Sequence, residues 1–241
     1  MCRVLLMNKQ GEEEIEKNYG LDRYLRFLEK QLGGHGNGFS LLKNGKVISL
    51  KKGVNLDVRD IANAFRKNDY DWALFHTRLA SVGTISDKNC HPFRNGNIVL
   101  AMNGTEKSVD FLSDTLEVTD TEAILDIISK YHLGLPALKK LNSIFMGFFN
   151  GNPFVVADNV LNIKIYKNKK ALVFASDFPY KFKNTFIPKE CFLWNGRELK
   201  VKLEKYKRPY RTVYYKDLVL EKDGYGQYYI DADVIEEGGN I

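Results

Sequence analysis

The chain has 241 residues, of which 44% are hydrophobic, 12% aromatic and 27% charged. This is ordinary usage for a soluble globular protein, and it excludes collagen-like, low-complexity and mostly disordered chains. The 36 lysines and arginines outnumber the 30 aspartates and glutamates, and this net charge of +6 fits either an acidic partner or simple solubility.

Hydrophobic spacing predicts an alternation of strands and helices. We expect, in chain order, a strand at 2–8, a helix at 21–32, strands at 39–42 and 46–50, a helix at 57–67, strands at 72–78 and 97–102, a helix at 120–132, and strands at 143–150, 153–157, 161–167, 171–175, 191–194 and 197–203. Asn44-Gly45, Asn150-Gly151 and Asn195-Gly196 are each expected to join two neighbouring strands, because both turn positions favour a positive φ.

This order of elements predicts an α+β fold of packed layers. We expect one domain over 2–205, followed by a basic, tyrosine-rich C-terminal extension over 206–241. No internal repeat and no low-complexity linker interrupts the domain.

The number and spacing of the three cysteines exclude two kinds of structural cysteine site. Cys2, Cys90 and Cys191 are an odd number without a close pair, so neither a disulfide framework nor a four-cysteine zinc site fits.

No stretch approaches the roughly 18 apolar residues that a membrane span needs, and the first residues lack a secretory pattern. We therefore expect a cytoplasmic protein without a membrane partner.

Cys2 has the position of a possible N-terminal nucleophile. Removal of the initiator Met1 would leave Cys2 with a free α-amine, whose pKa near ~7.7–8.0 makes it a usable base at neutral pH. A thiol and a base on one residue resemble an N-terminal threonine activated by its own amine. A retained Met1 would block that amine. The structural alternative is that Cys2 is a small hydrophobic residue of a buried strand.

Six short motifs follow one another along the chain. They are Met1-Cys2-Arg3, the glycine-rich run ending Gly36-Asn37-Gly38-Phe39, Phe75-His76-Thr77-Arg78-Leu79-Ala80-Ser81-Val82-Gly83, Asn89-Cys90-His91-Pro92-Phe93, Met102-Asn103-Gly104-Thr105 and Thr119-Asp120-Thr121-Glu122. In this series, over roughly residues 1–180, the chain resembles the class II glutamine amidotransferases, whose glutaminase domain is an N-terminal-nucleophile (Ntn) hydrolase, and especially their small standalone branch. The resemblance implies a four-layer αββα sandwich of two antiparallel sheets between helical layers.

The resemblance also implies a role for each site residue. Cys2 would attack the side-chain amide of glutamine, release ammonia and form a γ-glutamyl thioester that water hydrolyses. The Asn103 amide and the Gly104 N–H would stabilise the oxyanion, and losing one such donor typically raises the barrier by ~2.7–4 kcal/mol. Arg78 would clamp the α-carboxylate through two parallel hydrogen bonds, and Asp120 would accept from the α-ammonium. No metal or cofactor is implied.

The same residues have structural interpretations that the sequence leaves open. Asn103-Gly104 can be a simple turn, although no matching strand follows at once, and Arg78 can be a surface charge closing an apolar strand. Asp120 lies in a good helix N-cap sequence, and both roles can hold together.

Histidines and a second cysteine give weaker candidates. His35, His76 and His91 show no metal-ligand spacing, so we expect them to be structural or hydrogen-bonding residues. Cys90 beside His91 suggests a Cys-His pair, but neighbours on a strand point to opposite sides. Cys2 is therefore the favoured nucleophile.

Two positions depart from the pattern of the family. Many members carry an aromatic residue after the arginine and a histidine before the Asn-Gly pair, whereas this chain has Leu79 and Met102. Substrate fit is therefore expected to differ from that of the glucosamine-6-phosphate and amidophosphoribosyl enzymes. Arg3 and the glycine run are more similar to the short γ-glutamyl-hydrolase or uncharacterised branch.

Three functions remain open at this point. The leading one is a standalone glutaminase that hydrolyses glutamine and passes ammonia to a separate synthase subunit, because no phosphate loop of Walker spacing is present to activate an acceptor. A second is an Ntn amidohydrolase acting on another γ-glutamyl amide. A third is a catalytically idle binding module that docks nucleic acid or an acidic protein through a basic extension.

The C-terminal part has a distinctive composition. Residues 197–222 hold nine basic and four acidic residues, which is +5 of the net charge of +6. Interleaved tyrosines and basic residues can serve single-stranded nucleic acid. We favour strands that pack tyrosines on the domain, or a surface that docks a partner, because no recognised nucleic-acid motif is present.

Overall fold

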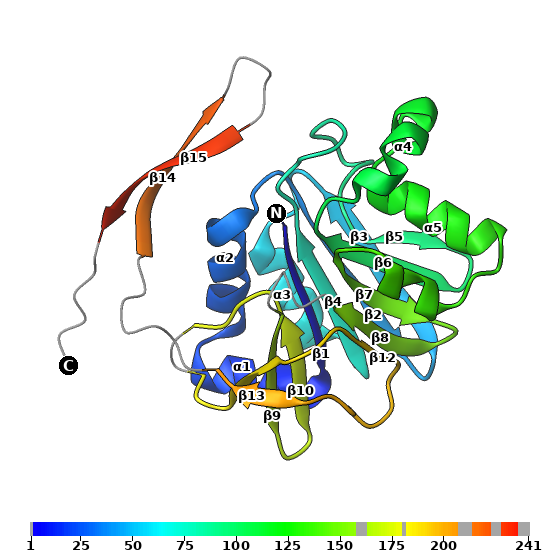
Figure 1. The fold of residues 1–241 in the computed structure, drawn as a ribbon. Coiled ribbons are helices and arrows are strands. Elements are labelled where there is room, and N and C mark those ends of the chain that lie inside the picture. Colours follow the sequence, from blue (N-terminus) through cyan, green and yellow to red (C-terminus); the bar gives the residue numbers. More distant parts are fainter. Residues whose placement is uncertain (1, 158–162, 180–181, 207–213, 223–227, 236–241) are drawn as a thin grey trace. The chain divides into compact units, whose positions relative to one another are not determined.

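The computed structural model describes residues 2–157, 163–179, 182–206, 214–222 and 228–235. Two compact units make up the chain, Met1–Lys205 and Tyr206–Ile241. Two antiparallel sheets and the helices that cover them form the first unit (Figure 1).

The larger sheet has eight strands in the described part of the chain, in the order β13-β11-β9-β10-β1-β4-β2-β3. Its strands are β1 (Arg3–Asn8), β2 (Asn37–Lys43), β3 (Lys46–Gly53), β4 (Trp72–Thr77), β9 (Lys164–Asn168), β10 (Ala171–Ala175), β11 (Thr185–Pro188) and β13 (Leu203–Lys205). All its pairings are antiparallel. The first strand of the chain is therefore central, with β10 on one side and β4 on the other.

The smaller sheet has five described strands in the order β12-β8-β7-β6-β5. These are β5 (Phe93–Asn95), β6 (Ile98–Asn103), β7 (Ile144–Phe149), β8 (Asn152–Ala157) and β12 (Phe192–Trp194), all paired antiparallel. The two Asn-Gly turns at 44–45 and 150–151 join β2 to β3 and β7 to β8 as expected, and all four turn residues have a positive φ.

Helices cover the outer face of each sheet. They are α1 (Lys9–Asn18), α2 (Leu21–Leu32), α3 (Val58–Lys67), α4 (Asp110–Leu116) and α5 (Asp120–Lys130), with short 3-10 helices η1 (Lys107–Val109) and η2 (Leu135–Lys140). Figure 1 shows α4 and α5 together on one side of the unit. The predicted helices at 21–32, 57–67 and 120–132 are thus present, the last ending at Lys130.

Three apolar clusters fill the spaces between these layers. One lies between α1–α3 and the larger sheet and contains Leu25, Phe39 and Phe65, with the last two rings packed edge to face. The second lies between the sheets and contains Leu6 and Met146, and the third joins the smaller sheet to α5. This is the expected αββα sandwich.

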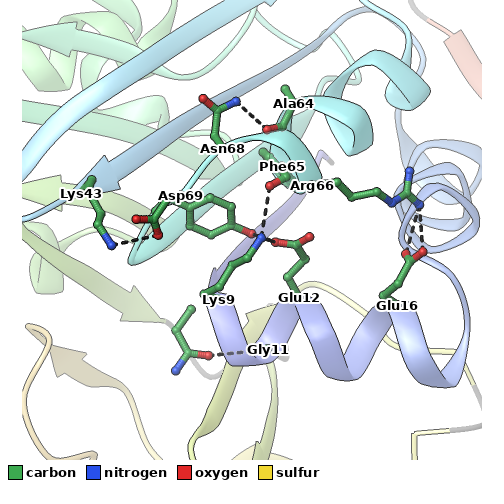
Figure 2. Close-up of polar contacts among 12 residues, drawn as sticks. Lys9, Gly11, Glu12, Glu16, Lys43, Ala64, Phe65, Arg66, Asn68 and Asp69 are labelled. Carbon is green, nitrogen blue, oxygen red and sulfur yellow. Dashed lines mark hydrogen bonds and ion pairs between the residues drawn. The ribbon is translucent and has the colours of Figure 1, made fainter.

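A buried polar network fixes α1 against the end of α3. The Lys9 ammonium lies 2.5 Å from the Glu12 carboxylate and donates to the Phe65 carbonyl at 3.3 Å (Figure 2). Glu12 is only 4% exposed and also accepts from the Tyr70 hydroxyl. Arg66 reaches Glu16 of the same helix at 3.0 Å. These contacts hold a helix that offers few apolar side chains to the core.

Helix α2 is tied to the start of β1. The Arg3 guanidinium donates to Gln31 at 3.2 Å, and the Gln31 amide donates to the Asp177 carboxylate at 2.8 Å. The Tyr24 hydroxyl donates to the Asp177 carbonyl at 2.8 Å. This chain of contacts fixes the backbone that immediately follows Cys2.

The structure corrects one predicted hairpin. Asn195-Gly196 does not join neighbouring strands: β12 before it pairs with β8, whereas residues 197–202 form no strand and β13 pairs with β11 in the other sheet. Gly196 does have φ +81°, so the local turn is present. The segments before and after this turn pair with strands that are distant in sequence, and a turn motif carries no information about such pairing.

The second unit contains one described hairpin. β14 (Tyr214–Lys222) pairs antiparallel with β15 (Tyr228–Ile235), with a register shift between Tyr215 and Leu218. The expected packing of tyrosine side chains in this segment lies outside the described residues. Among the described residues, none of the helices combines the length and the apolar character that crossing a membrane requires.

Candidate active site

Cys2 lies at the entry of the central strand β1 and is 7% exposed. Its thiol lies against the backbone of Leu79, whose N–H donates to Sγ at 3.4 Å and whose carbonyl accepts from the thiol at 3.5 Å. The register of β1 with β4, which pairs Arg3 with Thr77, explains this position. The segment that follows β4 therefore passes directly over the sulfur.

The electrostatic environment of Cys2 combines burial with nearby charges that include Arg78 and Asp120. Burial raises the pKa of the thiol, the Leu79 N–H and the Arg78 guanidinium lower it, and Asp120 raises it. The thiol is therefore neutral at neutral pH and needs a base before it can act as a nucleophile. Arg78 and Asp120 both lie near enough to the sulfur to influence its ionisation.

Arg78 is buried, with 3% exposure, and its guanidinium holds the loop that follows it. One terminal nitrogen donates to the Thr84 carbonyl at 2.8 Å, and the other to the carbonyls of Val82 at 2.7 Å and Gly83 at 3.3 Å. Burial lowers the pKa of this guanidinium, opposed by Cys2, Cys90 and Asp120. In this structure the two nitrogens that would clamp a carboxylate bind backbone oxygens.

The glycine-rich run beside β4 packs tightly against residues 90 and 91. A Cβ on Gly36, which has φ +128°, would lie 2.3 Å from Cys90 Sγ, and a Cβ on Gly38 would lie 2.0 Å from the His91 carbonyl. Only glycine allows this approach. The run also extends the sheet, because the Arg78 N–H donates to the Gly36 carbonyl at 2.8 Å.

All three expected structural histidines make hydrogen bonds. His35 Nδ1 accepts from the Ala80 N–H at 2.9 Å, and His76 Nε2 lies 3.0 Å from the Met102 carbonyl. His91 stacks on His76 with ring centroids 4.1 Å apart, and its Nδ1 accepts from the Met102 N–H at 3.4 Å. Burial lowers the pKa of His76 to about 3, and burial together with His76 and nearby cations lowers that of His91 well below its usual range.

Asn103 and Gly104 end β6 on the same side of the sandwich as Cys2. Asn103 is 2% exposed; its Nδ2 donates to the Ser176 hydroxyl at 3.2 Å, and its Oδ1 has no hydrogen-bond partner among the described residues. Gly104 has φ +151°, and a Cβ there would lie 2.1 Å from Ser143 Oγ. Glycine is therefore required at 104 by conformation and by space.

Asp120 is the first residue of α5, behind the Thr119 N-cap, as the sequence predicted. Its carboxylate accepts from the Glu106 N–H at 3.0 Å and from the Thr121 N–H at 2.8 Å. Burial raises the pKa of Asp120, and these N–H donors oppose the rise. Glu106 also accepts from the Ser143 hydroxyl, so this residue is hydrogen-bonded both to Asp120 and to the residue that precedes β7.

The structure thus brings Cys2, Arg78 and Asp120 within electrostatic reach and connects Asn103 to β1 through Ser176. Sequence reasoning missed Ser143, Ser176 and Glu106. Ser176 directly follows the apolar strand β10, and Ser143 directly precedes β7. Neither serine stands in one of the motifs that carry the resemblance, so the one local signal for them is a polar residue beside an apolar strand.

The rest of the described chain contains no stronger candidate for a functional site. The described residues contain no group of three His, Cys, Asp or Glu that could hold a metal ion. A cavity of about 540 Å³ lies at the opposite ends of the strands, where Leu42, Asn97 and Gly151 are among the lining residues. None of the candidate site residues lines it.

Comparison with known proteins supports the fold. No protein-family model matches the chain, and no curated protein matches it in sequence. Glutamine phosphoribosylpyrophosphate (PRPP) amidotransferase from B. subtilis, complexed with ADP and GMP, is similar at a TM-score of 0.59 and 20% identity, over 88% of this chain and 50% of that one. A structure of the allosteric regulatory enzyme of purine biosynthesis is similar at a TM-score of 0.56 and 22% identity, over 82% and 49%.

These similarities establish the architecture. The chain spans about half the length of each of these two structures. Its two antiparallel sheets between helices match the Ntn-hydrolase fold, so the fold class expected from the sequence is confirmed.

Proposed function

We propose that the chain is a glutaminase-type amidohydrolase that uses Cys2 as nucleophile and delivers ammonia to a separate acceptor synthase. One observation carries the proposal. The buried Cys2 thiol, which opens the central strand of an Ntn-hydrolase fold, has a cation at Arg78 and a carboxylate at Asp120 within electrostatic range. These two charges are complementary to the carboxylate and ammonium of a free amino acid.

The proposed reaction requires that Met1 be removed, because it uses the free α-amine of Cys2. The free α-amine of Cys2 takes the thiol proton, and the sulfur attacks the side-chain carbonyl carbon of glutamine. The tetrahedral oxyanion forms against the Asn103 amide and the Gly104 N–H. Breaking the C–N bond, with return of the proton to nitrogen, releases ammonia and leaves a thioester. Water then breaks the C–S bond to give glutamate and the free thiol.

Substrate binding involves a rearrangement around Arg78. Since its terminal nitrogens donate to the Val82 and Thr84 carbonyls, the substrate carboxylate replaces these carbonyls or takes the remaining N–H groups. Cys2, Arg78 and Asp120 are all at most 7% exposed, so the loop over them moves when substrate enters.

The test is release of glutamate and ammonia from glutamine by protein whose mass shows loss of Met1. We expect one ammonia per glutamate, and no turnover by Cys2→Ala. Cys191→Ala is the matched control, because it removes a thiol remote in sequence from the motifs. No turnover by the processed wild-type protein, or equal turnover by Cys2→Ala, overturns the proposal.

A second substrate class is favoured by two residues. The Leu79 N–H donates to the Cys2 thiol, and Met102 is the last apolar residue of β6. Many amidotransferases carry other residue types at these two positions. Hydrolysis of another γ-glutamyl amide uses the same nucleophile and the same recognition of the amino-acid end. Comparing glutamine with N-substituted γ-glutamyl amides separates the two, since the preferred substrate has the higher kcat/KM.

A further inference from the structure

The Ser176 hydroxyl joins two parts of the candidate site that are far apart in sequence. Its oxygen accepts from the Val4 N–H at 2.9 Å and from Asn103 Nδ2 at 3.2 Å, and its hydrogen points to the Val4 carbonyl at 3.3 Å. The Ser176 N–H donates to the same carbonyl at 3.0 Å. A hydroxyl has one hydrogen and two lone pairs, so all its capacity is used.

The Ser176 hydroxyl and its partners are buried, and one of these partners is close to Cys2 in the sequence. Val4 is two residues from Cys2 on β1, and Val4, Asn103 and Ser176 are 0%, 2% and 7% exposed. Water therefore has little access to replace a lost partner. In the described part of the chain, the Asn103 side-chain amide makes a hydrogen bond to Ser176 and to no other residue.

An amide used as an oxyanion donor must present its nitrogen rather than its oxygen. The Asn103 NH₂ has two hydrogens, so one can be held by Ser176 while the second remains for the substrate. Without a fixed partner, rotation of the amide by half a turn would present Oδ1 to the developing negative charge. Nothing else in the described chain hydrogen-bonds either end of this amide.

We propose that Ser176 is a positioning residue that orients the Asn103 amide for oxyanion stabilisation and fixes it to the strand that carries Cys2. The proposal rests on the proposed function of Cys2 and Asn103. Ser176 touches no substrate atom in this account and acts through Asn103.

The experiment is a double-mutant cycle on glutamine hydrolysis with Ser176→Ala and Asn103→Ala. We expect Ser176→Ala to lower kcat about 10- to 100-fold, less than the 10²–10³ typical for loss of a whole oxyanion donor, with KM within twofold. In the Asn103→Ala background the same change should have little further effect, because its route of action is already removed.

Matched variants separate positioning from folding. Ser176→Thr and Ser176→Val have the same shape and differ in the hydroxyl, so the Thr variant should retain far more activity than the Val variant. Ser40→Ala is the control for losing a buried strand hydroxyl, because Ser40 Oγ donates to the Ser49 carbonyl at 2.9 Å within the sheet. It should leave kcat unchanged.

The outcomes are distinct. If wild-type protein hydrolyses glutamine but Ser176→Ala keeps its kcat, or loses the same factor with and without Asn103, the positioning role is wrong while the proposed function stands. Equal activity of the Thr and Val variants contradicts the role even where Ser176→Ala fails to fold. Absence of hydrolysis by the wild-type protein overturns both proposals.

Discussion

Burial shifts three ionisable side chains of the site toward their neutral forms. The pKa of the Cys2 thiol is raised, that of the Arg78 guanidinium lowered and that of the Asp120 carboxyl raised, each chiefly by burial. A zwitterionic substrate would bring a carboxylate to Arg78 and an ammonium to Asp120 in the same space. The charges that are costly to bury alone would then be paired, which gives selectivity for amino acids over simple amides.

Substitution of Arg78 should affect binding more than chemistry. We expect Arg78→Ala to raise the KM for glutamine about 10- to 100-fold, since hydrogen bonds to charged groups contribute about 1.5–3 kcal/mol. Arg78→Lys should recover little, because an ammonium lacks the planar fork. Steady-state kinetics check this, with Arg94→Ala at an exposed position as control. An unchanged KM would show that zwitterion recognition is wrongly assigned.

The stacked His76 and His91 should make the fold sensitive to acid. Both are buried, and the pKa of His76 is lowered to about 3. A group whose folded pKa is below its unfolded value of about 6.5 favours the folded state above that value and loses this contribution as the pH falls toward 3. The shift of His76 alone should therefore lower the free energy of unfolding by about 2 kcal/mol between pH 7 and pH 5, and the lowered pKa of His91 acts in the same direction.

Urea unfolding at the two pH values tests this. His76→Phe should reduce the pH dependence, and His132→Asn, at an exposed position, should leave it unchanged. The same pH dependence in His76→Phe as in wild type would contradict the assignment.

At the scale of elements, α1 depends on a polar network rather than on an apolar face. Glu12 accepts from both Lys9 and Tyr70 while buried. Breaking a buried pair typically costs about 3–5 kcal/mol, and because the Lys9 side chain is 27% exposed we expect about 2 kcal/mol for Glu12→Ala. Chemical denaturation measures the change. Lys43→Ala, which breaks exposed pairs with Asp69 and Asp71, should leave the midpoint unchanged, and equal midpoints for the Glu12 and Lys43 variants would contradict the proposed role of Glu12.

The end of β6 should not accept a side chain at 104. Ser143, which a Cβ on Gly104 would meet, is buried and donates its hydroxyl hydrogen to Glu106, so moving it away would break this hydrogen bond. We expect Gly104→Ala to lower kcat about 10²- to 10³-fold, the range for a lost oxyanion donor. Gly96→Ala is the control: its φ is +57° but nothing lies within 4 Å of the new Cβ. Equal kcat for the two variants would contradict the role of Gly104.

Sequence patterns predicted the elements with strong local signals. The Asn44-Gly45 and Asn150-Gly151 hairpins and the helix after Asp57 were found, because their turns and cap are set by neighbouring residues. Helix α1 was missed, since Ile15 is its one buried large apolar residue and its N-cap Asn8 lies in a strand. The short β11 and β13 were missed or misplaced because their pairing depends on distant strands.

The candidate site was predictable where a motif carries the residue. Cys2, Arg78, Asn103, Gly104 and Asp120 stand in such motifs, and the structure shows their surroundings. The hydrogen bonds from the Arg78 guanidinium to the carbonyls of residues 82–84 could not be predicted, because they depend on how this loop folds back over the side chain.

For the whole molecule, counting the charges of each unit separately changes the interpretation of the net charge. The segment 206–241 holds five basic and seven acidic residues, a net charge of −2, so residues 1–205 carry +8. The basic run at 197–222 spans the boundary between the units. The expectation that the extension is the basic part of the chain is therefore wrong, and electrostatic docking of an acidic partner would involve the first unit as well.

Removal of the second unit tests its independence. The first unit contains all the candidate site residues and all three described apolar clusters. We expect a chain truncated after Lys205 to unfold cooperatively and to keep its kcat/KM for glutamine within about twofold. Calorimetry and kinetics check the two expectations, and loss of cooperative unfolding would show that the units depend on each other.

Labelling of Met1-free protein with a glutamine-analogue electrophile, located by peptide mass spectrometry, tests directly whether Cys2 is the nucleophile. We expect one label, on Cys2, with glutamine protecting against it and a simple amide without the α-amino and α-carboxyl groups giving no protection. Cys90 and Cys191 should stay unlabelled. A label on either of these cysteines instead of Cys2, or labelling of Cys2 that glutamine does not slow, would contradict the account.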